Sequence, residues 1–178
     1  MRWLSGLIAL CGFVTLAVAA DLKLALTGEN TTVEFTGTKK EGKHDGGFKK
    51  LTGTAVATSA DPTTLAFDVV IDTESLWSDN AMLTAHLKGA DFFDVKTNPT
   101  AKFKSTKVEK TDAGYTVHGE LTLNGKTKAV HFPAQVTLSD KALKLGSTFT
   151  IKKSDFGMNY GAGKIDDDVA LRVKIETK

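Results

Sequence analysis

The stretch YTVHGELTLNGKTKAVHF, residues 115–132, decides the fold of this chain. From Tyr115 to Leu123 it alternates apolar and small or polar residues, the two-residue period of a half-buried strand. The pair Asn124-Gly125 follows, and it favours a type I′ turn because both central residues of that turn need a positive φ. A second alternating run comes after the turn. The stretch therefore predicts an antiparallel β-hairpin.

The same alternation recurs along most of the chain and predicts an all-β fold. Turn-forming residues such as Asp61-Pro62 and Asp112-Ala113-Gly114 separate the runs. Strands with one polar and one apolar face fit either a sandwich or a barrel, and the pattern alone does not decide between them. About eight or nine strands are expected, at Asp21–Thr27, Thr31–Thr38, Leu51–Ser59, Leu65–Asp72, Ala101–Val108, Tyr115–Leu123, Ala129–Leu138, Leu143–Ile151 and Val169–Glu176.

One insertion, within Ser75–Thr106, breaks the alternation. It predicts a single short helix within Asp79–Gly89, capped by Asp79 or Asn80 and ended by Gly89. One face of this helix would carry Met82, Leu83, His86 and Leu87, and the bulky pair Phe92-Phe93 follows it. These side chains have more apolar area than a surface connection needs. We therefore expect Leu76–Val95 to act as a lid that closes one mouth of a barrel.

Residues 1–20 differ from the rest and are interpreted as a signal peptide. They combine Arg2, an apolar stretch and a small-residue end before Asp21, which indicates a secreted or periplasmic protein. Cys11 is the only cysteine, so the expected mature domain, 21–178, has no disulfide, catalytic thiolate or cysteine-bound metal. Without Arg2 the basic residues fall from 23 to 22, against 21 acidic residues. Both charges are interleaved, which argues against a nucleic-acid partner.

The apolar faces of the expected strands mix large and small residues. Phenylalanines stand at 35, 67, 103, 132 and 149, while glycine, alanine or serine stands at 53, 55, 57, 105, 119, 134 and 147. This mixture has two interpretations: small residues can complement large ones in a filled core, or they can leave a lumen for an apolar guest. Both remain open at this point.

The four histidines are the candidates for catalytic or metal-binding groups. With a two-residue turn at 124–125, His118 would lie directly opposite His131, but no third ligand is evident, so no metal site is expected. His44 is expected in a loop, with a role at a pocket mouth as the minor alternative, and His86 is expected on the helix. Asp166–Asp168 is interpreted as a solvated turn rather than a calcium loop. No nucleophile elbow, HExxH or phosphate loop occurs, so no catalytic residue is assigned.

Several motifs resemble the YceI family of lipocalin-like, polyisoprenoid-binding periplasmic proteins. The resemblance lies in SLWSDN, LTAHLK, DFFDV and NPTAKF within 75–103, and in Gly47-Phe48 followed by Gly53. It continues in GELTLNGKTK at 119–128, FTIKKSDFGM at 149–158 and the closing strand at 169–175. One departure is Lys153, where many members of the family have an arginine.

This resemblance implies an eight-stranded antiparallel lipocalin-like β-barrel with one short helical lid. It implies binding, sequestration or transport of a long-chain isoprenoid or quinone-type lipid in the periplasm, with transient membrane contact allowed and no other cofactor. The alternatives are an enzyme or metal protein acting through its histidines on a small apolar substrate, and a filled barrel that serves as an interaction module. The oligomeric state is left open. The expected lipid contacts are Phe35, Phe48, Phe67, Trp77, Met82, Leu87, Phe92, Phe93, Phe103, Phe132 and Phe149.

Overall fold

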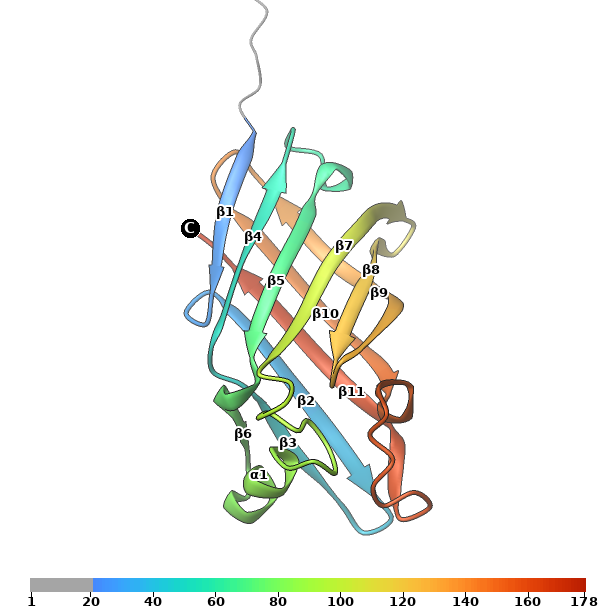
Figure 1. Cartoon of the computed structure of the whole chain (residues 1–178). Coiled ribbons are helices and arrows are strands. Elements are labelled where there is room, and N and C mark those ends of the chain that lie inside the picture. The colour runs from blue at the N-terminus through green and yellow to red at the C-terminus, as the bar shows by residue number, and fades with distance from the viewer. Residues whose placement is uncertain (1–20) are drawn as a thin grey trace, which may run out of the picture.

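The structure, a computed structural model, describes residues 21–178, so the expected signal peptide lies outside the described residues. Antiparallel strands curl around an apolar interior, and the helix α1 (Ala81–Leu87) lies at the end of the sheet opposite the start of β1 (Figure 1). The strands are β1 Leu22–Thr27, β2 Thr31–Lys39, β3 Gly42–Phe48, β4 Leu51–Ala57, β5 Ala66–Asp72, β6 Leu76–Ser78, β7 Thr100–Thr111, β8 Gly114–Leu123, β9 Lys126–Leu138, β10 Leu143–Lys152 and β11 Ile165–Glu176. Three single-turn 3₁₀ helices are η1 Pro62–Thr64, η2 Thr73–Ser75 and η3 Lys153–Phe156.

The expectation of an all-β fold with one short α-helix is confirmed for the described residues, but the predicted count of eight strands is wrong. The sheet has 11 strands in the order β1-β4-β5-β7-β8-β9-β10-β11-β2-β3-β6. Three short breaks, each of at most three residues, separate β1 from β2, β3 from β4 and β5 from β6. The first break was expected, and the strands absent from the nine expected runs are β3 and β6. Ser75 holds one break: its carbonyl accepts from Lys49 N–H and its hydroxyl from Lys50 N–H.

The hairpin predicted around Asn124-Gly125 is confirmed as β8 and β9. Both turn residues have a positive φ, 48° and 70°, and the register places His118 opposite His131. The turn is also tied to distant segments. The amide nitrogen of Asn98 donates to the side-chain oxygen of Asn124, and the Asn124 amide donates to the Phe156 carbonyl, at 3.0 and 3.1 Å. A local signal thus fixes the hairpin, and long-range hydrogen bonds fix its place.

Two segments expected outside strands are strands, and both expectations are corrected. The stretch around His44, interpreted as a loop, forms β3. A Cβ at Gly46 would lie 2.4 Å from the Phe35 ring, so the glycine lets that ring cross the strand. Asp166–Asp168, interpreted as a turn, belongs to β11. There the carboxylates are held locally: Asp168 pairs with Lys152 at 2.9 Å, for example.

The helix α1 begins at the second of the two predicted capping residues. Asn80 Oδ1 accepts a hydrogen bond from Leu83 N–H at 3.0 Å. The helix ends at Leu87, with Lys88 as its C-cap, one residue before the predicted terminator Gly89. This glycine does not adopt the left-handed conformation. It instead closes the last turn, because its N–H donates to the His86 carbonyl at 2.9 Å.

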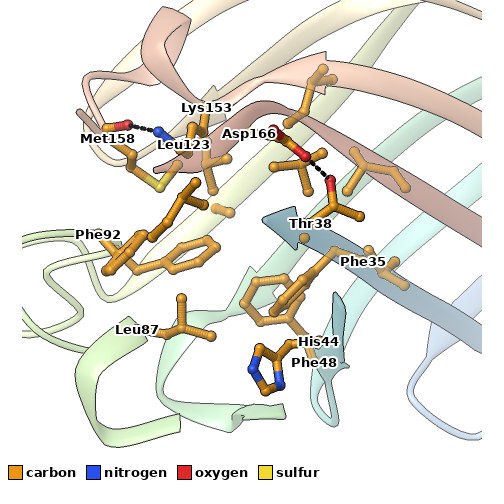
Figure 2. Close-up of a pocket in the computed structure, with 18 of the residues that line it drawn as sticks. Phe35, Thr38, His44, Phe48, Leu87, Phe92, Leu123, Lys153, Met158 and Asp166 are labelled. Carbon is orange, nitrogen blue, oxygen red and sulfur yellow. Dashed lines mark hydrogen bonds between the residues drawn. The ribbon is translucent and has the colours of Figure 1, made fainter. Parts of the chain in front are cut away.

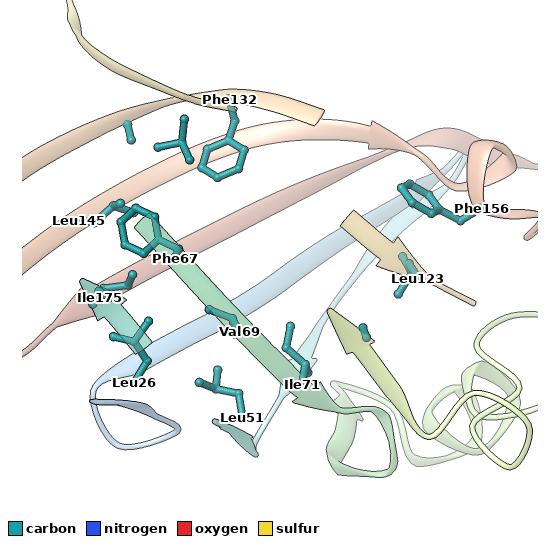
Figure 3. Packing of buried hydrophobic residues seen from close by; sticks show 14 of the residues in the cluster. Leu26, Leu51, Phe67, Val69, Ile71, Leu123, Phe132, Leu145, Phe156 and Ile175 are labelled. Atoms are coloured by element: carbon teal, nitrogen blue, oxygen red, sulfur yellow. The ribbon is translucent and has the colours of Figure 1, made fainter. Parts of the chain in front are cut away.

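One half of the interior is filled. In Figure 3, Phe67, Phe132 and Leu145 point toward one another from different strands, and all three are buried. Phe132 stacks on Phe149 with ring centroids 4.3 Å apart, and the Phe103 centroid lies 5.6 Å from that of Phe132. The missing side chain of Gly119 leaves room for the Phe103 ring, since a Cβ there would lie 2.7 Å from it. In this half the small residues complement the large ones.

Candidate functional site

The other half of the interior contains a cavity of about 250 Å³. Its walls come from the sheet on one side and from the segment 83–93 on the other (Figure 2). Most of the lining side chains are apolar: Val33, Phe35, Phe48, Ile71, Leu83, Leu87, Phe92, Phe93, Ala101, Leu121, Leu123, Ile151, Met158, Ile165, Val169 and Leu171.

Strand alternation and the helical segment build this cavity together. Register pairs such as Phe35↔Leu171 and Ile71↔Ala101 put inward positions of neighbouring strands side by side. Leu83 and Leu87 face the cavity because they are four residues apart on one side of α1. Beyond the helix, Phe93 N–H donates to the Leu87 carbonyl at 3.0 Å. The loop is therefore folded back so that its phenylalanines turn inward.

Three aromatic rings form the most continuous part of the wall. The centroid of Phe93 lies 5.6 Å from that of Phe48 and 6.3 Å from that of Phe35, and Phe35 and Phe48 are 6.2 Å apart. Their interplanar angles range from 34° to 78°, within the tilted and edge-on geometries that aromatic pairs prefer. The rings therefore join β2, β3 and the helical segment across the cavity.

Few polar side chains reach the cavity. Lys153 is 6% exposed, and its Nζ donates to the carbonyls of Met158 and Tyr160 at 3.3 and 3.4 Å (Figure 2). On another side, the Thr38 hydroxyl donates to Asp166 Oδ2 at 2.6 Å. A mostly apolar site with a small number of placed polar groups is typical of pockets for apolar small molecules.

His44 lines the cavity, the minor of the two roles considered for it, and ties the lid segment to β3. Its Nδ1 lies 2.9 Å from Asp79 Oδ1, and Asp79 Oδ2 accepts a hydrogen bond from Asp45 N–H at 3.1 Å. The hydrogen bond from the Asp45 backbone, followed by the interaction with His44, lowers the pKa of Asp79 below its ordinary value. The start of the lid segment is therefore held by an ionised carboxylate.

The structure divides the predicted lipid contacts into three groups. Phe35, Phe48, Leu87, Phe92 and Phe93 line the cavity. Four others belong to the packed interior outside it: Phe67, Phe103, Phe132 and Phe149.

The remaining two predicted contacts lie away from the cavity. Met82 is 82% exposed, because it lies on the solvent side of α1. Trp77 lines an outer groove with Glu34 and Arg172. Leu121 and Leu123 line the cavity and were not predicted to do so, although their alternation in β8 marks them as inward-facing.

The predicted pair His118 and His131 is present on the outer face, with ring centroids 5.9 Å apart. Glu109, which was not predicted, brings Oε2 to 2.8 Å from His118 Nε2, a distance that suits an ion pair although the alignment is not that of a hydrogen bond. His86 contacts Asp91 at 3.0 Å on the lid. Within residues 21–178 no three histidine, cysteine or acidic side chains are arranged to hold a metal ion.

Among the described residues no helix is long and apolar enough to cross a membrane.

Comparisons with known proteins relate the chain to bacterial proteins. It is 34% identical over 182 residues to a UPF0312 protein of Serratia proteamaculans, covering 90% of this chain and 87% of that protein. The crystal structure of Burkholderia cenocepacia BcnA has the same fold, with a TM-score of 0.75, 24% identity and coverage of 83% of this chain and 96% of that one.

A polyisoprenoid-binding domain from Saccharophagus degradans, implicated in plant cell wall breakdown, is a further structural neighbour. It has a TM-score of 0.64 and 16% identity over 87% of this chain and 98% of that one. The family model of the YceI-like domain matches residues 24–177, nearly the whole described chain. The chain therefore belongs to the YceI-like family.

Proposed function

We propose that this chain binds an isoprenoid-type lipid in the cavity between the sheet and the lid segment. The observation that carries the proposal is the cavity itself, which is almost wholly apolar and lined from both sides. The polyisoprenoid-binding neighbour from Saccharophagus degradans supports the ligand class. The few polar groups, such as Lys153 and the Thr38–Asp166 pair, would contact a polar end of the lipid, including a quinone-type head.

The cavity volume sets the scale of the affinity. A 150 Å³ apolar cavity holds benzene, about 25 Å³ per carbon atom, so about 250 Å³ accommodates roughly ten carbon atoms, or two isoprene units. Burying ten carbons at about 0.8 kcal/mol each gives an upper limit of about 8 kcal/mol, equivalent to a Kd near 1 µM. Because the ligand also loses entropy on binding, the actual affinity should lie below this upper limit.

The proposed role is sequestration or transport rather than catalysis. The four histidines are divided among the cavity wall, the outer side of the lid and the outer face of β8 and β9. No observation favours the alternative of a histidine-based enzyme or metal protein. With the leader removed before Asp21, we propose that the domain works in the periplasm and takes up its lipid during transient contact with a membrane.

Two measurements test the proposal. Protein purified from its native host is extracted with organic solvent, and the extract is analysed by mass spectrometry; an isoprenoid lipid near one molecule per chain is expected. Delipidated protein is then titrated with geraniol, a ten-carbon isoprenoid alcohol, by calorimetry. If no isoprenoid lipid is recovered and geraniol shows no saturable binding, the proposed function is wrong.

A further inference from the structure

The hydrogen-bonded ladder between β9 and β10 covers only part of these strands. It runs from Leu138↔Leu143 to Gln135↔Gly146 and stops there. The first half of β9 pairs with β8, and the second half of β10 pairs with β11, but the described ladder does not join these halves to each other. The curled sheet therefore has a lateral gap between β9 and β10.

Pro133 explains where the ladder stops. The two-residue turn makes Leu123 and Lys126 a hydrogen-bonded pair, so even-numbered residues of β9 bond to β8 and odd-numbered ones face β10. The odd-numbered Pro133 has no N–H to donate across the gap. Its carbonyl instead accepts from the Ser147 hydroxyl at 2.5 Å. The gap is thus encoded by the sequence.

A groove in this gap adjoins the cavity. Its apolar floor includes Val130, Phe149, Ile151 and Phe156, and Ile151 also lines the cavity. Lys128, another groove residue, pairs in register with Leu121 of the cavity wall. The cavity and the groove are therefore neighbours on the same inner surface.

A longer chain needs an exit from the cavity. The cavity accommodates roughly ten carbon atoms, and the stacked rings of Phe132 and Phe149 occupy the interior toward the filled half. Longer chains therefore cannot simply continue along the interior. The groove beside Ile151 offers an apolar path that leaves the packed rings in place.

The rim of the groove favours a neutral chain over other occupants. It carries Lys128 and Lys152 against Asp155 and Asp168, so it offers no net charge to a charged head group. Lys126 and Lys128 lie on the inward face of β9, since they pair with Leu123 and Leu121. Inward lysines oppose the pairing of a second protein strand with this edge, whereas the aliphatic stem of Lys128 can cover a lipid chain.

We propose that the gap between β9 and β10 is a second, lateral opening of the cavity, which takes the part of the lipid chain that the cavity cannot hold. The proposal rests on the proposed lipid-binding function. It predicts that affinity continues to rise for chains longer than ten carbons. Burying two further methylene groups is worth about tenfold in affinity. Geranylgeraniol, with twenty carbons, should therefore bind at least tenfold more tightly than geraniol.

The test blocks the groove without entering the cavity. Val130 is half-buried and lies in the groove but not in the cavity lining, so Val130→Trp should leave geraniol affinity within about twofold and abolish the gain for geranylgeraniol. A second variant, Val130→Cys with Cys11→Ser, is folded first and then alkylated with N-phenylmaleimide. Thr137→Cys with Cys11→Ser, alkylated in the same way, is the control, because Thr137 is exposed on β9 where the ladder is intact.

The outcomes separate this proposal from the proposed function. Loss of the geranylgeraniol gain on blocking position 130, but not position 137, supports the lateral opening. A gain that survives in Val130→Trp and in the alkylated Val130→Cys protein overturns it, as does a wild-type affinity that does not rise beyond geraniol. If no alcohol of the series binds the wild-type chain, the proposed function fails as well.

Discussion

Ala101 offers a direct test of whether the cavity is the binding site. It is 2% exposed and lines the cavity beside Ile71. Ala101→Leu adds three carbon atoms, which occupy about 75 Å³ of the roughly 250 Å³ available. A ligand that loses burial of about three carbons loses about 2.4 kcal/mol, so geraniol affinity should fall about 50-fold.

The unfolding free energy should move the other way. Because the added carbons enter a void, the unliganded variant should be as stable as the wild type or up to about 2 kcal/mol more stable. Ala55→Leu is the matched control: Ala55 is 1% exposed and pairs with Phe67 in the filled half. There the same change overpacks the core, which should cost about 1–3 kcal/mol and leave affinity within about twofold.

Calorimetric titration with geraniol and urea unfolding of the delipidated proteins measure both quantities. A hollow binding cavity requires that Ala101→Leu lower the affinity without lowering the stability. If Ala101→Leu binds geraniol as tightly as the wild type, the ligand does not occupy this cavity. If Ala101→Leu is destabilised as much as Ala55→Leu, the cavity is not a void of the size described.

Four further predictions concern the lid, the core and the outer histidines. Asp79→Asn should speed hydrogen exchange in 76–95 at pH 7. Because the pKa of Asp79 is lowered in the folded protein, the difference in exchange rate between variant and wild type should persist down to about pH 4. It should disappear as the pH falls through that lowered pKa, where the wild-type carboxylate is protonated. Exchange in 76–95 should slow when geraniol binds, and equal protection in both states would exclude a gating lid. Phe132→Ala should lower the unfolding free energy by about 3–5 kcal/mol in urea, since it removes a buried, stacked ring. Zinc titration should show only weak binding that His118→Ala barely changes; sub-micromolar binding lost in that variant would reveal a metal site.

Local signals predicted the parts of the fold that depend on neighbouring residues. The hairpin at Asn124-Gly125 and the cap at Asn80 need only short-range geometry, and both are present. The break between β1 and β2 was also expected, but the breaks beside β3 and β6 could not be predicted in this way. They depend on hydrogen bonds that the N–H groups of Lys49 and Lys50 donate to Ser75, about 25 residues away, and no pattern in the sequence indicates such a contact.

The site was predicted less completely than the fold because alternation shows which side chains face inward but not what they meet there. Phe35 and Phe149 both lie on inward faces, yet only Phe35 lines the cavity. Whether each ring lines the cavity depends on the residues it contacts in neighbouring strands: Phe149 stacks on Phe132, while Phe35 lies across Gly46. Whether a lumen is hollow or filled at a given level depends on these pairings between distant strands.

The two halves of the interior differ in how many exposed contacts hold them. The filled half is held by buried rings and aliphatic side chains, which resist opening. The lid end is held by two kinds of contact. Leu87, Phe92 and Phe93 are buried, whereas the contacts of His44 with Asp79 and of His86 with Asp91 are exposed. The exposed contacts are each worth at most about 1 kcal/mol, so most of the cost of separating the lid from the sheet lies in exposing its buried side chains.

The polar turn at the base of the lid limits how far that separation extends. Asn124 joins Asn98, three residues after the lid segment, to the carbonyl of Phe156, which is 1% exposed. The exposed contacts of the lid thus lie around α1, and side-chain hydrogen bonds fix the chain where it returns to β7. We expect the mouth around α1 to open for exchange of the proposed lipid while the sheet keeps its shape, and the hydrogen exchange of 76–95 with and without geraniol tests this.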